Sequence, residues 1–248
     1  MQLYIIRHAQ SMNNAMWAAT GSEEGRDPDP ELTEIGHRQA RRLAQALAEL
    51  DGTTPLADER DRHNRRGYGL THVYTSLMRR ALDTGHAIAE AVGLPLLVWR
   101  EIHEWGGIYG RDAATGEQVG LPGVRRSDLD GRYGRLVMPE WLDEKGWWNR
   151  PFEPREETRA RAAAFWQALL ARHGGTDDRV ALVTHGGFTA ALLQTLLRFK
   201  PQTEIGGAPR DIWFVANNAS ISRIDVTADV IRLVYLNRVD HLPPELIT

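Results

Sequence analysis

Short apolar runs alternate along this chain with longer amphipathic stretches. Runs rich in branched apolar residues predict buried strands at 2–6, 71–75, 96–99, 180–183, 220–226 and 230–235. Apolar residues at helical spacing predict helices over 79–92, from 157 to the glycine pair at 174–175, and over 187–197. Strands that alternate with helices favour an α/β fold, a three-layer α/β/α sandwich with a mostly parallel central sheet.

Polar segments separate some of these elements. Residues 12–31 and 51–69 are rich in charged residues and contain glycine and proline, so we expect loops there. Between them, Thr33 can cap a helix. The apolar face of that helix would be formed by Ala40, Leu43, Leu47 and Leu50.

The longest segment without clear periodicity covers residues 105–155. A stretch of this length inside a compact domain commonly serves as a lid or a binding insertion. We therefore expect one domain over residues 1–248, in which 105–155 forms a lid over the strand ends and sets substrate specificity. Three tryptophans of the segment either pack the insertion or line a substrate wall: Trp141, Trp147 and Trp148.

Composition narrows the classes of function. The 248 residues carry 30 basic and 33 acidic side chains, a formal net charge of −3, so no overall basic excess points to nucleic acid or a membrane surface. The absence of cysteine excludes disulfides, thiolate catalysis and thiolate-bound metals. No apolar run approaches the roughly 20 residues that span a bilayer. We expect a cytoplasmic protein with no nucleic-acid or membrane partner.

Chemically active side chains follow four of the predicted strands. In open α/β sheets, ligands bind beyond the carboxyl ends of the strands, so these side chains should meet at one rim. They are Arg7, His8 and Ser11, then Ser76, Arg79 and Arg80, then Glu101 and Glu104, and finally His185, which is followed by the backbone of Gly186. Guanidinium forks match phosphate oxygens, and a neutral imidazole is a nucleophile. The rim therefore predicts a phosphate site with histidine chemistry.

The same residues carry a resemblance to a known family. Arg7-His8-Ala9-Gln10-Ser11 resembles the Arg-His-Gly signature of the histidine phosphatase superfamily, also called phosphoglycerate mutase-like. Further matching segments follow in the family's order, spread over residues 2 to about 190: Asn14, Leu32-Thr33 with Gly36, Ser76 to Thr84, and Thr184-His185-Gly186. Ala9 stands where the family usually has glycine. If that position needs a positive φ, the pocket must have adjusted.

The resemblance implies a role for each residue of the rim. His8 would attack a phosphate monoester and carry the phosphoryl group as phosphohistidine, while its other ring nitrogen donates to a carbonyl such as that of Ala9. Arg7, Arg80 and His185, the last if protonated, would donate to the phosphate oxygens. Arg79 is expected to lie on the helix face. Further phosphate contacts would come from Asn14, Ser11 and Gly186.

The leaving group needs a proton, for which the family uses a carboxylate after the third strand. Glu104 is the preferred candidate because Trp105 and the following glycine pair could bury it beside the pocket. Glu101 is the alternative. We expect neither a cofactor nor a metal, because the histidines lack the usual ligand spacing and an arginine-rich rim repels cations. Most other histidines, including His72 and His173, are expected at the surface or at edges.

These residues fit more than one reaction. A phosphatase acting on a small phosphorylated metabolite or a phosphosugar is preferred, since the longer motifs that the glycolytic mutases share around the third strand are missing. A phosphoglycerate mutase-type phosphotransferase is the alternative, and a non-catalytic phosphate-binding scaffold is a third hypothesis of another class. The sequence is also compatible with a homodimer.

Overall fold

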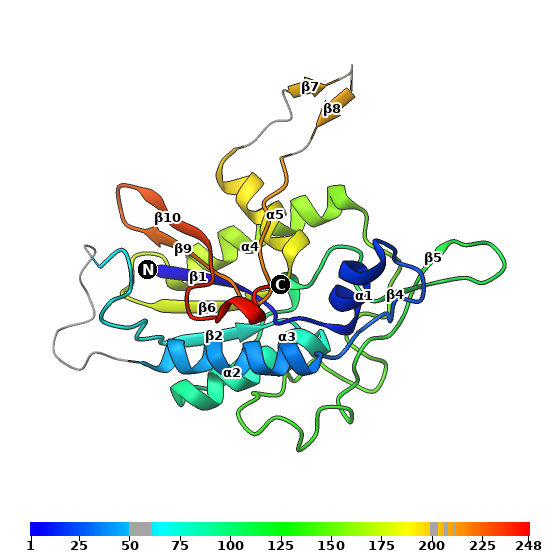
Figure 1. The fold of residues 1–248 in the computed structure, drawn as a ribbon, viewed down its shortest axis with the longest axis horizontal. Helices are drawn as coiled ribbons and strands as arrows, with labels where there is room; N and C mark the ends of the chain where they lie inside the picture. The colour runs from blue at the N-terminus through cyan, green and yellow to red at the C-terminus, as the bar shows by residue number, and fades with distance from the viewer. Residues whose placement is uncertain (50–60, 199–202, 206–207, 211) are drawn as a thin grey trace.

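A six-stranded sheet forms the centre of the computed structural model, which describes residues 1–49, 61–198, 203–205, 208–210 and 212–248 (Figure 1). The strand order is β10-β9-β1-β6-β2-β3. The strands are β1 (Gln2–Arg7), β2 (His72–Thr75), β3 (Leu96–Val98), β6 (Arg179–Thr184), β9 (Ile221–Val226) and β10 (Ile231–Arg238). β1, β6, β2 and β3 run parallel, β9 pairs antiparallel with β1, and β10 pairs antiparallel with β9.

Helices cover both faces of this sheet (Figure 1). α2 (Glu34–Ala48) and α3 (Arg79–Val92) lie on one face, and α4 (Arg155–His173) and α5 (Gly186–Leu196) on the other. The alternation of side chains in β1 shows why both faces are apolar: Tyr4 and Ile6 join the core under α2 and α3, whereas Leu3 and Ile5 join the core under α4 and α5. The predicted α/β fold with a mostly parallel sheet is confirmed.

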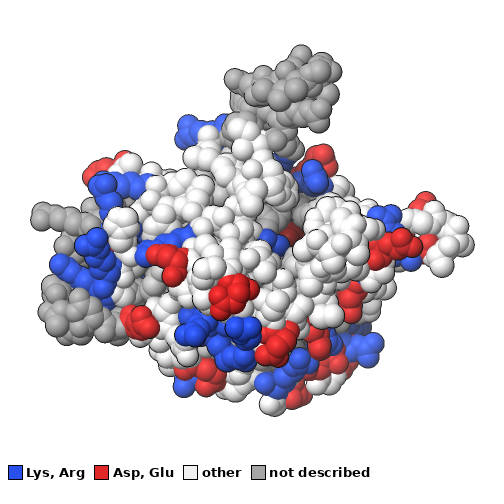
Figure 2. Space-filling model, viewed as in Figure 1, with Lys and Arg blue, Asp and Glu red and all other residues white. Residues whose placement is uncertain are grey.

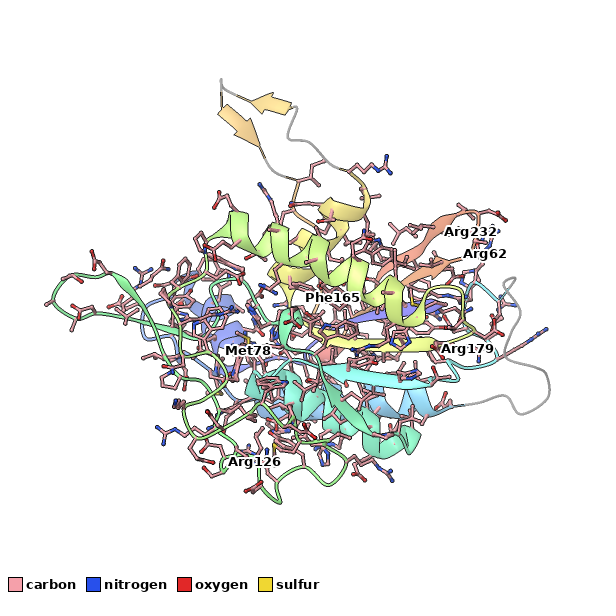
Figure 3. All side chains as sticks on the ribbon, turned by 180° about the vertical axis from the view of Figure 1, so that it is seen from behind. Arg62, Met78, Arg126, Phe165, Arg179 and Arg232 are labelled. Carbon is pink, nitrogen blue, oxygen red and sulfur yellow. The ribbon has the colours of Figure 1, made fainter. Side chains whose placement is uncertain are left out.

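The predicted helices agree with the structure to within two residues at their described ends. α4 begins at Arg155 rather than 157, and Phe165 of this helix points toward the sheet (Figure 3). Thr33 caps α2 by accepting a hydrogen bond from the Gly36 N–H. Leu50 and residues 51–60 lie outside the described residues. No helix in the described part of the chain has the length and apolar character that crossing a bilayer requires.

The loop expected over 12–31 is wrong for its first part, where α1 (Met12–Thr20) forms. Ser11 and Asn14 make a capping box at its start, and Gly21 closes it in the left-handed conformation. None of its residues is fully buried, so the helix has no apolar face that periodicity could reveal. Its caps, rather than its packing, define it.

Two short hairpins also lie outside the predicted elements. The first, β4 (Tyr109–Arg111) with β5 (Gln118–Gly120), belongs to the segment 105–155, and the second joins β7 (Thr203–Ile205) to β8 (Ala208–Arg210). The 105–155 segment also extends the edge of the sheet, where Leu136 bridges Leu96 of β3. Trp147 and Trp148 are buried in a separate apolar cluster with Leu77 and Met78. Of the three tryptophans considered, these two pack the insertion, while Trp141 is half exposed.

Candidate active site

The predicted rim residues meet at the carboxyl ends of the parallel strands. His8 follows β1, Arg80 lies in the first turn of α3 after β2, and His185 is the residue between β6 and α5. The imidazole rings of His8 and His185 lie 5.1 Å apart between centroids. Both histidines and Arg80 are buried. Figure 3 shows Met78, two residues before Arg80, at this end of the sheet.

His8 is held in the tautomer that a nucleophile needs. Its Nδ1 lies 2.7 Å from the carbonyl oxygen of Ala9, which can only accept, so Nδ1 carries the hydrogen. Its Nε2 accepts a hydrogen bond from Nε of Arg80 at 3.1 Å and therefore bears the lone pair. The predicted contact between His8 and a backbone carbonyl is confirmed, and it leaves Nε2 facing the arginine.

The surroundings of His8 also keep its ring neutral. Burial lowers the pKa of His8 well below its ordinary value, and the charges of Arg80 and Arg7 lower it further. The hydrogen bond to Ala9 opposes this shift. The ring therefore remains an unprotonated base at neutral pH, and the larger cause is loss of water rather than the arginine charges.

His185 has one satisfied and one unsatisfied nitrogen. Its Nε2 lies 2.7 Å from Oγ of Ser76, whereas its Nδ1 is buried without a hydrogen-bond partner. Burial lowers the pKa of His185 well below its ordinary value, and Arg80 and His8 act in the same direction. The proton expected on His185 is therefore disfavoured here. With the Ser76 hydroxyl donating to Nε2, neutral His185 still offers its Nδ1–H as a donor.

The guanidinium of Arg7 has one hydrogen-bonded nitrogen and one nitrogen without a partner. Its guanidinium donates through one terminal nitrogen to the carbonyl of Ala216, while its Nε is buried without a partner. A Cβ built on Gly186 would lie 3.6 Å from that Nε, so the first turn of α5 borders the unpaired donor. Buried donors in folded proteins almost always have partners, so two orphans beside His8 mark a place for an acceptor.

The structure separates the two candidate carboxylates. The Glu101 side chain is exposed, and its backbone carbonyl accepts a hydrogen bond from Arg161. The Glu104 carboxylate is bound by the N–H groups of Gly187 at 3.1 Å, Phe188 at 3.0 Å and Trp105 at 2.9 Å. Burial lowers the pKa of both Arg7 and Arg80, and the negative charge of Glu104 opposes this shift. Glu104, and not Glu101, lies beside Arg7 and Arg80.

Asn14 and Ser11 lie at the start of α1 beside the His8 segment. The Asn14 Oδ1 accepts hydrogen bonds from N and Oγ of Ser11 and from Nδ2 of Asn218. Nδ2 of Asn218 also lies 3.1 Å from the His8 carbonyl oxygen. With its oxygen occupied, Asn14 has its Nδ2 left to donate to a ligand. Asn218 was not predicted, because nothing in the residues before β9 signals that they return to this loop.

Asp29 is a second residue that the sequence did not reveal. Its Oδ1 accepts the Arg79 N–H at 3.0 Å and lies 3.7 Å from a terminal nitrogen of Arg80, while Oδ2 is buried without a partner. Burial raises the pKa of Asp29 from 3.8 to about 6, although Arg80 opposes the shift. The side chain of Arg79 itself pairs with Glu31, as expected for a residue on the helix face.

The departure at Ala9 requires no adjustment. Its backbone does not adopt a positive φ, and its N–H donates to Oγ1 of Thr84 at 3.1 Å. The glycine at position 36 does have a steric reason, since a Cβ there would lie 2.1 Å from the carbonyl oxygen of Gln10. α2 therefore packs directly against the loop that carries His8.

Sequence comparison agrees with this arrangement. The profile described as "Histidine phosphatase superfamily (branch 1)" matches residues 3–57 and 59–239. The chain belongs to this family. The motif resemblance and the fold that it implied are thereby confirmed.

Several curated proteins resemble this histidine phosphatase. A glucosyl-3-phosphoglycerate phosphatase of Mycobacterium tuberculosis is 30% identical over 203 residues, which cover 79% of this chain and 75% of that protein. A 2,3-bisphosphoglycerate-dependent phosphoglycerate mutase of Methylobacterium radiotolerans is 28% identical over 199 residues, 78% of each chain. A phosphoserine phosphatase of Entamoeba histolytica, solved with phosphoserine, shares the fold with a TM-score of 0.55 at 18% identity, over 98% of this chain and 99% of that one.

The wall of this histidine phosphatase site adds one more cation. Arg26, from the segment after α1, donates to the Tyr109 carbonyl at 2.9 Å and stacks 4.0 Å above the centre of the Tyr109 ring. Burial lowers the pKa of Arg80, and the positive charge of Arg26 acts in the same direction. On the face shown in Figure 2, basic and acidic side chains are interspersed. Neither sign of charge dominates that face.

Proposed function

We propose that this protein is a phosphatase that hydrolyses phosphate monoesters of small metabolites through a phosphohistidine on His8, without a cofactor or a metal. This proposal rests on two buried donors that have no hydrogen-bond partner, Nε of Arg7 and Nδ1 of His185. Both belong to the site that contains the unprotonated Nε2 of His8. A phosphoryl group is rich in acceptor oxygens and would satisfy both donors while meeting the nucleophile.

In the first step, Nε2 of His8 attacks phosphorus, the bond to the ester oxygen breaks, and the leaving oxygen takes a proton from the carboxylic acid form of Glu104, which the second step regenerates. Arg80 turns its Nε from His8 to a phosphoryl oxygen, and Arg7 and His185 donate to the others. The charge that develops on these oxygens is then met by fixed donors inside a buried site, where such contacts have their largest effect.

In the second step, water attacks the phosphohistidine, the P–N bond breaks, and Glu104 takes the proton of the water. Inorganic phosphate leaves, and His8 regains its lone pair. The position of Glu104 supports both roles, because the amides of Gly187 and Phe188 fix its carboxylate beside the arginines. Nothing in this cycle needs an oxidant, a reductant or a second substrate other than water.

We propose that the substrate carries a second acidic group. Arg26 supplies positive charge near Arg80, and the carbonyl and the ring of Tyr109 hold its guanidinium in place. Two relatives are named for glucosyl-3-phosphoglycerate and phosphoserine, and both compounds contain a carboxylate besides the phosphate. A small phosphorylated carboxylic acid therefore fits this site better than a neutral phosphosugar.

A phosphoglycerate mutase is the second candidate, because some similar curated proteins carry that name. It shares the first half-reaction, and a hydroxyl of the retained ligand replaces water in the second. The non-catalytic scaffold is disfavoured, since His8, Arg7, Arg80 and His185 are all present and assembled. The single domain, the lid role of 105–155, a homodimer and a cytoplasmic location stay predictions.

Phosphate release separates these candidates. Wild type should release phosphate from p-nitrophenyl phosphate and, faster, from 3-phosphoglycerate or phosphoserine, and His8→Ala should release none above background. Equal turnover by His8→Ala would reject the mechanism. Conversion of 3-phosphoglycerate to 2-phosphoglycerate that depends on 2,3-bisphosphoglycerate, with little phosphate released, would assign the mutase reaction instead.

A further inference from the structure

Three potential metal ligands meet at the opposite end of the sheet from His8. His72 is the first residue of β2, His173 is the last residue of α4, and Asp178 directly precedes β6. Figure 3 marks this end with Arg179, far along the sheet from Met78. His173 was expected at the surface or at an edge; it lies at the end of α4 and its side chain is buried, with 2% exposed. His72 and Asp178 remain open to solvent, with 33% and 27% of their side chains exposed.

The spacing of these side chains suits one small cation. Their ligand atoms all lie within 4.8 Å of one another. The Asp178 carboxylate lies 2.8 Å from Nδ1 of His173 through one oxygen and 3.9 Å from Nδ1 of His72 through the other. Two ligand atoms that each lie about 2.1 Å from a tetrahedral zinc ion are roughly 3.4 Å from each other. This separation is between the observed 2.8 Å and 3.9 Å. Small rotations of exposed His72 and Asp178 would complete the geometry.

The surroundings prepare two of these groups as ligands. Nδ1 of His173 already lies 2.8 Å from the Asp178 carboxylate, so these two ligand groups face one another. Nε2 of His173 lies 3.1 Å from the Tyr74 hydroxyl. If Nδ1 binds a cation, the single ring hydrogen moves to Nε2 and donates to Tyr74, the kind of outer contact that orients metal-bound histidines.

We propose that His72, His173 and Asp178 bind one divalent transition-metal ion of the zinc class, with water in the remaining position. Two imidazoles and a carboxylate are ligands that zinc accepts. The ion would join the end of α4 and the turn before β6 to the start of β2. Because it lies at the far end of the sheet from His8, it stabilises the fold and takes no part in phosphoryl transfer.

Two existing contacts limit the affinity. The Thr71 hydroxyl lies 2.9 Å from Nδ1 of His72 and must turn away. Arg172, which stacks 4.4 Å from the centre of the Trp99 ring and whose NH1 lies 3.5 Å from the Tyr74 hydroxyl, places a positive charge nearby. Asp178 offsets part of this repulsion. We therefore expect micromolar rather than picomolar binding.

Equilibrium dialysis of the full chain, prepared without a histidine tag, against micromolar Zn²⁺ tests the site. Wild type should retain about one equivalent of zinc, and His72→Ala and Asp178→Asn should each lose it. His37→Ala, which removes an exposed histidine of α2, is the matched control and should bind like wild type. Zinc at 100 times its Kd should raise the Tm of wild type by roughly 5–10 °C, with no such rise in His72→Ala.

Three results would overturn the proposal. The first is wild type that binds no more zinc than the two variants. The second is zinc binding that His8→Ala abolishes, since the ion would then occupy the catalytic site. The third is an equal rise of Tm in wild type and both variants. Because Asp178→Asn keeps the side-chain shape, it preserves the test even if His72→Ala disturbs the start of β2.

Discussion

Asp29→Asn should remove a specific pH dependence of stability. The pKa of Asp29 rises from 3.8 to about 6 on folding, because the carboxylate is buried and Arg80 compensates it only in part. A raised carboxylate pKa means that the native state binds the proton more tightly than the unfolded chain. The contribution to stability is therefore full below pH 3.8 and is lost as the pH rises through about 6.

The magnitude follows from the shift. A change from 3.8 to about 6 is about 2.2 pKa units, and at about 1.36 kcal/mol per unit it corresponds to roughly 3 kcal/mol. About 2 kcal/mol of this contribution to the free energy of unfolding is lost between pH 4.5 and 7.0. The loss is steepest between the unfolded and the native pKa, where it approaches about 1.4 kcal/mol per pH unit. In Asp29→Asn this contribution is absent, whatever the constant effect of the amide on packing.

Urea unfolding followed by tryptophan fluorescence, at pH steps from 4.5 to 7.5, measures the effect. The free energy of unfolding of wild type minus that of Asp29→Asn should fall by about 2 kcal/mol across the range and level off above pH 7. Asp130→Asn, at an exposed carboxylate, controls for the loss of one negative charge. Parallel curves for wild type and Asp29→Asn would refute the assignment of a buried carboxylate with a raised pKa beside Arg80.

Four further substitutions test the catalytic geometry. Ser76→Ala leaves Nε2 of His185 without its partner and should lower the free energy of unfolding in urea by about 1–3 kcal/mol, with a lower kcat. Arg80→Lys removes the planar fork and should lower kcat for p-nitrophenyl phosphate by about 10²–10³ in steady-state assays. Glu104→Gln should slow alkyl phosphates by about 10²–10⁴ but p-nitrophenyl phosphate much less, because nitrophenolate leaves without a proton. Gly187→Ala places a Cβ 2.4 Å from the Glu104 carboxylate and should reproduce that leaving-group dependence in kcat.

Each of these expectations has a contrary result. Unchanged stability in Ser76→Ala would mean that the hydroxyl does not hold His185, and full activity in Arg80→Lys would mean that a single positive charge suffices. Equal losses on alkyl and nitrophenyl phosphates in Glu104→Gln would assign the carboxylate to positioning rather than proton transfer. An active Gly187→Ala with normal leaving-group dependence would show that α5 does not fix Glu104.

The convergence of the proposed catalytic residues could be predicted because the topology collects them. His8, Arg80 and His185 follow β1, β2 and β6, and parallel strands present their carboxyl ends to one rim. The positions of these residues after the strands were therefore enough to predict that they meet, without knowledge of side-chain contacts. The choice between Glu104 and Glu101 needed coordinates, since both follow the same strand and only the turn after it decides which carboxylate faces inward.

Other parts depended on the path of the chain. Asp29 and Asn218 reach the site from irregular segments before α2 and before β9, and such segments carry no periodic signal. α1 was missed because it buries no side chain fully, so only its capping residues Ser11 and Asn14 mark it. The cluster of His72 with His173 joins positions about one hundred residues apart, which no local spacing can reveal.

The central claim is covalent transfer to His8. Rapid quenching of wild type with a ³²P-labelled monoester should trap protein-bound phosphate that is labile in acid and stable in alkali, and it should be absent in His8→Ala. Turnover in which no labelled protein forms before phosphate release, or label that persists in His8→Ala, would contradict the account.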